Sequence, residues 1–245
     1  MNEQRSPKSS ELYHHYLSHH FGLGASSASR RRRIDSLACN YGNHLPDHRG
    51  AQILEIGPGL GELLEYLCHD RGYTAVSAID LSAEVAERCN LVVPGSTEVV
   101  RDSVAFLESN AGRFELIFAF HLLEHIPKPE IVRFLQAIRA ALAPGGRVFI
   151  EVPNMANPLV GLNIRYADFT HEVGFTESSL SFALRSAGFS EVSVFGIRIA
   201  RNSVSKIIQS AAQATVNLLL RLMIRVYLPT QRQLLHIAIC GVARK

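Results

Sequence analysis

The sequence lacks several features that would assign it to common classes of protein. It contains no tryptophan, and its four cysteines, Cys39, Cys68, Cys89 and Cys240, include no CxxC pair. Isolated cysteines of this kind are expected to be reduced thiols, as in a cytosolic protein. The N-terminal segment is polar and has no apolar core of a signal peptide. We therefore expect a cytoplasmic protein without disulfides.

The chain also lacks a strong excess of charge. The formal net charge is only +3 over 245 residues, which is too small to indicate a nucleic-acid partner by itself. No aromatic-rich basic groove and no Asn-Pro-Pro-Tyr type motif of amino-group methylation is apparent. A run of four arginines at 30–33 is expected to be a solvated, charged helix start, and it is the one feature that keeps an RNA acceptor as an alternative.

The N-terminal segment gives no metal site. His15 and His19 have the i, i+4 spacing that two ligands on one helix face would use. No nearby glutamate or third ligand accompanies them, so we expect no metal.

From about residue 51, short apolar segments alternate with amphipathic ones, and this alternation predicts an α/β fold. Such a pattern is typical of a doubly wound, mostly parallel sheet that helices cover on both faces. We expect a helical leader or cap over 1–50 and one domain over 51–245. Seven strands are predicted, at 51–57, 75–80, 98–102, 114–126, 147–154, 190–199 and 234–245.

A helical insertion at about 201–232 interrupts this alternation before the last strand. Gln213, Asn217, Arg221 and Arg225 recur every four residues and form a narrow polar stripe on an otherwise apolar helix. These polar residues argue against a transmembrane span, which needs about 20 apolar residues. Three alternatives remain for residues 205–228: a lid on its own domain, a homodimer face, or a peripheral helix at the inner membrane face.

A glycine-rich turn, "ILEIGPGLG" at 53–61, follows the first predicted strand. A turn without side chains at the start of a helix lets a ligand approach the backbone N–H groups closely. A dinucleotide site would need the pattern G-x-G-x-x-G, but here Gly57 and Gly59 are followed by Gly61 and Glu62. No Tyr-x-x-x-Lys dyad accompanies the turn, so a nicotinamide-dependent dehydrogenase is disfavoured.

Two aspartates follow the next two predicted strands. Asp80 ends the second strand, where a carboxylate can accept both ribose hydroxyls of a nucleoside. Its alternative role is a helix N-cap, which Ser82 could also provide. Asp102 follows the third strand, where it could accept an adenine amino group or simply cap the next helix.

Taken together, these motifs resemble the class I S-adenosylmethionine-dependent methyltransferases. "EIGPGLG" resembles their first motif, and "FELIFAFHLLEHIPKP" and "LAPGGRVFIEVPN" resemble their fourth- and fifth-strand segments. The resemblance covers 51 to about 190 and implies a Rossmann-like fold, S-adenosylmethionine as cofactor and methyl transfer as activity. It assigns to cofactor binding the residues Glu55, Gly57, Gly59, Gly61, Asp80, Leu81, Asp102, Ser103 and His121.

A narrower resemblance concerns the acceptor. "HLLEHIPKP" and "RYADFTHEVGFTESSL" are similar to a subgroup often met in surface-polysaccharide and secondary biosynthesis, with a D-x-T-H stretch at 168–171. It implies a small-molecule, sugar or lipid-linked glycan acceptor, methylated on a hydroxyl. The alternatives are a quinone or other lipophilic acceptor, RNA, and a non-catalytic membrane-associated interaction protein. The last is disfavoured, because nothing structural requires the glycine turn and both acids.

Methyl transfer to a hydroxyl benefits from a general base with a pKa near neutral, and histidine suits this role. His171 and His125 are the candidates, and Glu124 or Glu151 could orient either imidazole or bind acceptor hydroxyls. His121, at the end of the fourth strand, is expected to lie beside the cofactor. The structural alternatives are that His125 caps the loop before Pro127 and that His171 hydrogen-bonds only its own loop.

Overall fold

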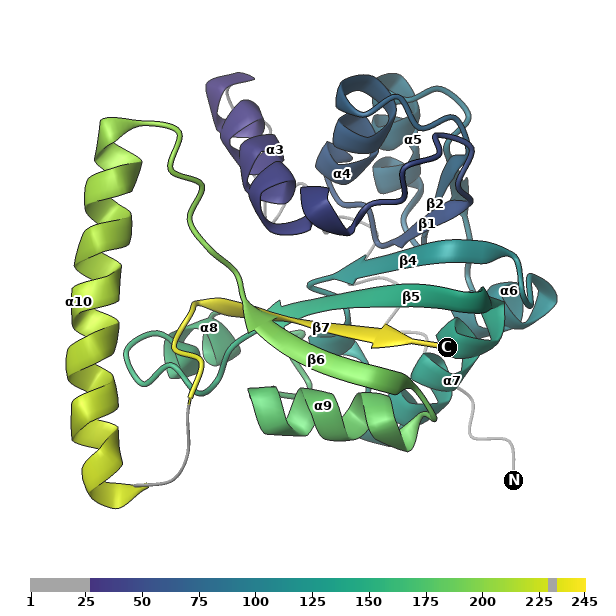
Figure 1. Ribbon diagram of the computed structural model, residues 1–245. Helices are drawn as coiled ribbons and strands as arrows, with labels where there is room; N and C mark the ends of the chain where they lie inside the picture. Colours follow the sequence, from purple (N-terminus) through teal and green to yellow (C-terminus); the bar gives the residue numbers. More distant parts are fainter. Residues whose placement is uncertain (1–26, 229–232) are drawn as a thin grey trace.

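The computed structural model describes residues 27–228 and 233–245 and contains one seven-stranded sheet (Figure 1). The strand order is β3-β2-β1-β4-β5-β7-β6. The first five strands run parallel, and β7 runs antiparallel to both β5 and β6. This confirms the predicted doubly wound sheet. The strands are β1 Ile53–Ile56, β2 Val76–Asp80, β3 Thr97–Val99, β4 Phe114–Phe120, β5 Leu142–Pro153, β6 Ser190–Gly196 and β7 Ala238–Arg244.

Helices cover both faces of this sheet, with α3, α4 and α5 on one side and α6, α7 and α9 on the other (Figure 1). The helix after the glycine turn continues beyond its α-helical part as a π-helical turn over Tyr66–Asp70. The α-helices are α3 Ser27–Tyr41, α4 Glu62–Glu65, α5 Ala83–Val92, α6 Ser103–Ser109, α7 Ile131–Ala141, α8 Gly161–Ala167, α9 Glu177–Ser186 and α10 Val204–Tyr227.

The core forms on both faces because successive residues of a buried strand point in opposite directions. Ile53, Phe118 and Phe149 pack with the helices on the α3 and α4 side. Their neighbours Leu54 and Ile117 pack with α7 and α9 on the other side. The central strands are therefore continuous apolar segments. Their burial fixes the position of the polar residues at their carboxyl ends.

The arginine run at 30–33 lies on α3, which packs against the domain. Ile34 and Tyr41 of this helix are fully buried. Arg30 pairs with Glu65, Arg33 pairs with Glu62 at 2.7 Å, and Arg31 pairs with Asp70 at 2.8 Å. These ion pairs on α4 and the following turn give the run a structural role, which its sequence did not indicate.

The predicted insertion before the last strand is the long helix α10, which stands to one side of the domain (Figure 1). It leaves the sheet after β6 and returns to β7.

The structure also corrects one boundary. The fifth strand, predicted at 147–154, begins earlier, at Leu142, because its pairing with β4 continues past a register shift. His15 and His19 lie outside the described residues.

Candidate functional site

The glycine turn lies at the carboxyl end of β1 and has a left-handed backbone at all three glycines. Gly57, Gly59 and Gly61 have φ values of +75°, +53° and +74°, a conformation that side chains disfavour. A Cβ placed on Gly61 would lie 3.2 Å from Cys89 Sγ, so this glycine allows close packing onto α5. A Cβ on Gly59 would meet no atom of the described residues within 4 Å. Gly59 therefore faces open space, where a ligand can approach the backbone.

Glu55 lies on β1 immediately before this turn and is 4% exposed. Burial raises its pKa to about 8, and the Glu62 and Asp80 carboxylates add to the shift. Its Oε2 atom has no hydrogen-bond partner within the described chain. A positively charged ligand beside this buried carboxyl group would stabilise its ionised form.

Asp80 ends β2, next to the glycine turn, as predicted. Its Oδ1 atom accepts a hydrogen bond from Ser82 N at 2.8 Å, while the Ser82 side chain caps α5. The alternative role of Asp80 as the helix cap is therefore wrong. Burial raises the pKa of Asp80 to about 6, although the backbone N–H groups of Ser82 and Leu81 oppose the shift. Leu81 is an exposed apolar residue beside it.

Asp102 is the N-cap of α6, and its Oδ1 atom accepts from Ala105 N at 3.0 Å. The capping alternative for this residue is thus present in the structure. The side chain is also exposed, and Ser103 begins the helix beside it. An adenine-side role for Asp102 and Ser103 stays a prediction.

His121 follows β4 directly and has the unusual φ of +50° for a residue with a side chain. Its Nε2 atom lies 3.0 Å from Glu151 Oε1, and its Nδ1 atom lies 3.4 Å from Glu124 Oε1. Desolvation opposes protonation of the ring, but these two carboxylates outweigh it and raise the pKa of His121 to about 10. The side chain is 53% exposed, so solvent screens part of this effect. The imidazolium is the form held at neutral pH.

Glu151 therefore orients His121 and not the two histidines considered as bases. Its second oxygen accepts a hydrogen bond from the Tyr41 hydroxyl, which α3 carries. Tyr41 is a residue of this site that the sequence did not reveal, because 110 residues separate it from Glu151.

The second cluster comprises His125, Thr170, His171 and Asp168. His125 Nδ1 lies 2.8 Å from Thr170 Oγ1, and that hydroxyl donates to Asp168 Oδ1 at 2.6 Å. The rings of His125 and His171 are 4.8 Å apart. The amide of Glu172 holds the loop in place by donating to the Glu124 carbonyl at 2.8 Å. The structure thus brings together the two predicted bases and the D-x-T-H stretch.

The two histidines differ in their surroundings. Desolvation lowers the pKa of His125, Glu124 opposes this effect, and His171 lowers the pKa further. His125 is therefore neutral at pH 7. His171 Nδ1 lies 3.1 Å from the backbone oxygen of Ile164 on α8, and the His171 side chain is 9% exposed. A proton-accepting role for either histidine stays a prediction.

Donor atoms of Glu124, His125 and His171 all lie within 4.8 Å of one another. Three such donors could hold a divalent cation. The sequence predicts no metal, and the ion pair with His121 already provides a counter-charge for Glu124.

Comparison with known proteins assigns this chain to a family. The sequence profile of the family described as "Methyltransferase domain" matches residues 29–194, about two thirds of the chain. This chain is a methyltransferase of that family. Ubiquinone biosynthesis O-methyltransferase of Xanthomonas oryzae pv. oryzae is 30% identical over 140 residues, which are 56% of this chain and 57% of that protein. The corresponding enzyme of Coxiella burnetii is 32% identical over 111 residues, which are 43% of this chain and 45% of that protein. The chain thus matches only about half the length of these curated relatives.

Solved structures agree with the methyltransferase fold. An S-adenosylmethionine-dependent methyltransferase from Archaeoglobus fulgidus superposes with a TM-score of 0.61 at 20% identity, covering 89% of this chain and 98% of that one. Phosphoethanolamine N-methyltransferase 2 of Haemonchus contortus, solved with S-adenosylmethionine, superposes with a TM-score of 0.58 at 16% identity, covering 95% of this chain and 56% of that one. These similarities show the Rossmann-like class I fold.

S-adenosylmethionine is the methyl donor of this class of methyltransferase, and the residues at the carboxyl edge of the sheet fit it. The left-handed turn leaves open space at Gly59. Glu55 provides a buried carboxyl group beside the turn, which suits the positive charges of the donor, and Asp80 can accept ribose hydroxyls. The individual roles of these residues remain predictions of the sequence.

Proposed function

We propose that this methyltransferase methylates a hydroxyl group of a lipophilic acceptor, with His125 as the general base. The hydrogen-bonded chain from His125 through Thr170 to Asp168 carries this proposal. S-adenosylmethionine supplies an activated methyl group, so the protein has to position the acceptor and remove its proton.

The network supports one tautomer of His125. A threonine hydroxyl has a single hydrogen, and Thr170 donates it to Asp168. The same hydroxyl must then accept from the Nδ1–H group of His125, so the lone pair is on Nε2. Neutral His125 can accept the acceptor's hydroxyl proton at this nitrogen. Asp168 stabilises the resulting positive charge through Thr170.

Exposed apolar side chains on this loop and on the preceding helix α8 support a lipophilic acceptor. Phe169, between Asp168 and Thr170, is 94% exposed, and Leu162 and Tyr166 on α8 are 74% and 76% exposed. Exposed apolar side chains on segments next to a proton-accepting group suit a ligand that is apolar around its hydroxyl.

Acidity favours a phenolic hydroxyl. A phenol has a pKa of about 10, as in tyrosine, which a neutral imidazole can deprotonate far more readily than an aliphatic alcohol. The curated relatives are named for ubiquinone biosynthesis, and this name supports a phenolic precursor of a quinone as the acceptor class.

A hydroxyl of a lipid-linked glycan is the second candidate. It is favoured by the D-x-T-H stretch, which resembles the polysaccharide subgroup, and by the carboxylates of Glu124 and Asp168 beside His125. An RNA acceptor loses its main support, because three arginines of the run at 30–33 are paired with acids of the domain.

The test is a transfer assay with the full chain, S-adenosylmethionine and three acceptors: a prenylated catechol, catechol itself and a polyprenyl-linked sugar. We expect the prenylated catechol to give the highest kcat/KM, measured as S-adenosylhomocysteine released. His125→Ala should abolish most turnover, and His48→Ala, an exposed histidine paired with Glu115, is the matched control. Preference for the sugar would select the second candidate, and equal rates for both catechols would contradict a lipophilic site.

A further inference from the structure

The helix α10 is apolar and uncovered. None of its 24 residues, all of which the structure describes, is buried. Ten of its larger apolar side chains are between 41% and 85% exposed. These residues are Val204, Ile207, Ile208, Val216, Leu218, Leu219, Leu222, Met223, Val226 and Tyr227. Exposed apolar surface on this scale marks a contact with another molecule or a membrane.

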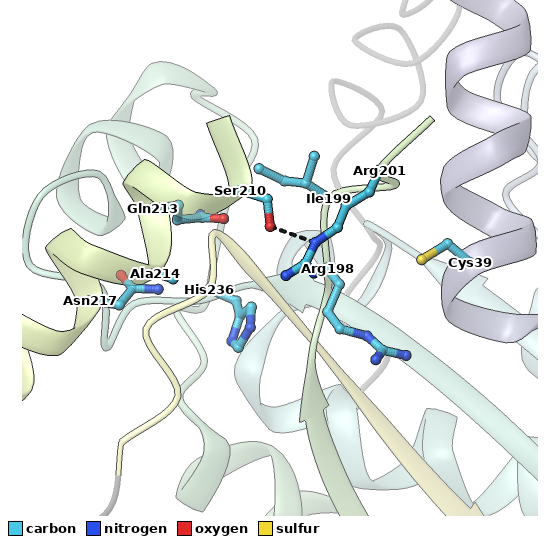
Figure 2. A pocket seen from close by; sticks show the side chains of 9 residues that line it. All are labelled: Cys39, Arg198, Ile199, Arg201, Ser210, Gln213, Ala214, Asn217 and His236. Carbon is cyan, nitrogen blue, oxygen red and sulfur yellow. Dashed lines mark hydrogen bonds between the residues drawn. The ribbon is translucent and has the colours of Figure 1, made fainter. Parts of the chain in front are cut away.

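The face that α10 presents to the domain also differs from that of an ordinary amphipathic helix. Its polar residues Ser210, Gln213 and Asn217 line a pocket of about 390 Å³ between α10 and the domain (Figure 2). Arg201 reaches across this pocket and donates to Ser210 Oγ at 3.0 Å. An amphipathic helix normally buries its apolar face against the domain. Here Ser210, Gln213 and Asn217 face the domain, and the large apolar residues named above are exposed.

The charged side chains of α10 and of the sequence on either side of it are all positive. After Glu191 the chain contains no aspartate or glutamate. The charged residues of α10 are Lys206, Arg221 and Arg225. Two copies of the helix packed together would oppose like charges without an acid to compensate them. An anionic lipid surface is the complementary partner.

The connections of α10 favour a helix that lies in the plane of the membrane over one that crosses it. By length and composition α10 could cross a bilayer, since 24 residues extend about 36 Å. However, β6 and β7 pair directly, with Gly196 opposite Ile239, so both ends of the insertion return to the same sheet. A crossing helix would place Val204 and Tyr227 on opposite sides of the bilayer, whereas β6 and β7, which flank the insertion, belong to one sheet on one side of it.

We propose that α10 is an in-plane anchor that binds this methyltransferase to the surface of an anionic lipid bilayer. The insertion returns to the sheet at Ala238, which pairs with Pro153 at the carboxyl end of β5. The residues of the candidate active site lie at this same edge. Docking through α10 therefore brings the catalytic edge to the membrane, although the anchor itself does not depend on which acceptor is used.

Vesicle co-sedimentation of the full chain tests this anchor. We expect binding to vesicles of phosphatidylcholine with 30% phosphatidylglycerol and much weaker binding to pure phosphatidylcholine, with a strong salt dependence. The triple variant Ile208→Ser, Leu219→Ser and Met223→Ser should bind at least about 100-fold more weakly, because each substitution removes an apolar side chain that the membrane would bury. Leu91→Ser with Phe182→Ser, which changes exposed apolar residues elsewhere, is the matched control and should bind as the wild type does.

A charge variant keeps the test independent of the apolar substitutions. Lys206→Glu with Arg225→Glu should weaken binding to anionic vesicles by more than the roughly fivefold that each cation contributes. Arg133→Glu on the exposed face of α7 is its control. Failure of the wild type to sediment with anionic vesicles would overturn the proposal. A dimer in light scattering that the triple variant abolishes, without vesicle binding, would assign α10 to a second copy of the chain. Turnover of water-soluble catechol, measured in parallel, tests the proposed activity separately.

Discussion

His125 and Thr170 lie 2.8 Å apart, from Nδ1 to Oγ1, although 45 residues separate them in the chain. This hydrogen bond links the imidazole that follows β4 to the aspartate of the loop before α9. It gives His125 a defined tautomer, which is the property that a general base needs.

Removal of this link should slow catalysis without loss of the donor. In Thr170→Val the Nδ1–H group of His125 loses its acceptor, so we expect kcat to fall about tenfold, the equivalent of one hydrogen bond. The affinity for S-adenosylmethionine, measured by calorimetry, should stay unchanged. Thr74→Val, at an exposed threonine that donates to Arg49 O, is the control. A fall in donor affinity as large as the fall in kcat would contradict the role given to Thr170.

Alanine substitutions of the two histidines should differ in their effect on turnover. His125→Ala should reduce turnover by roughly 10²–10⁴-fold if it is the general base. His171→Ala should reduce it less, because this imidazole is hydrogen-bonded to Ile164 O of α8 and its side chain is only 9% exposed. Steady-state kinetics with saturating donor measures both. The reverse order of the two losses would transfer the role of base to His171.

On the acid side of the pH profile, activity should fall at a pH below the usual pKa of histidine. Desolvation lowers the pKa of His125 from its usual 6.5, and only the neutral ring can accept a proton. Activity should therefore be constant near neutral pH and fall only when the pH drops below 6.5, through the lowered pKa. A plot of log kcat/KM against pH measures this limb. An acid limb above pH 6.5 that His125→Ala leaves in place would exclude His125 as its origin.

Much of this architecture follows from local patterns. The alternation of apolar segments predicted the seven strands, and the spacing of Gly57, Gly59 and Gly61 predicted the open turn beside Asp80. These features depend on neighbouring residues, because side-chain period and backbone conformation are local properties.

The remaining features depend on contacts between distant segments. Tyr41 reaches Glu151 only because α3 packs on the sheet, and no periodicity in the sequence encodes that packing. The pairing of Arg30 with Glu65 has the same origin. The polar stripe of α10 was visible in the sequence, but its direction was not. A helical pattern shows that a face is apolar without showing what that face meets.

The open space at Gly59 should be essential for donor binding. In Gly59→Val a side chain would project into that space from a left-handed backbone, so we expect affinity for S-adenosylmethionine to fall below detection in calorimetry. Gly112→Val is a closely matched control, because Gly112 has φ +74° and also faces open space among the described residues, but in the turn before β4. Both variants carry the same strain, and only the first should lose the donor. Equal loss in both variants would attribute the effect to folding.

Binding of S-adenosylmethionine should release a proton near pH 7. Burial, with Glu62 and Asp80 nearby, raises the pKa of Glu55 to about 8 in the protein without ligand, so this carboxyl group is largely protonated at pH 7. The sulfonium and amino groups of the donor are positive and favour the carboxylate, which lowers that pKa and expels the proton. Calorimetric titrations at pH 7 in phosphate and in Tris should therefore give different apparent enthalpies. The difference, divided by the difference in buffer ionisation enthalpy, counts the protons released.

Two comparisons test whether Glu55 is the source of that proton. Glu55→Gln has no carboxyl group to ionise, so its apparent enthalpy should depend far less on the buffer, even where its affinity for the donor is reduced. S-adenosylhomocysteine lacks the sulfonium charge and should release fewer protons from the wild type. Equal enthalpies in both buffers for the wild type would mean that Glu55 stays protonated beside the bound donor. Its carboxyl group would then act as a hydrogen-bond donor and not as a counter-charge.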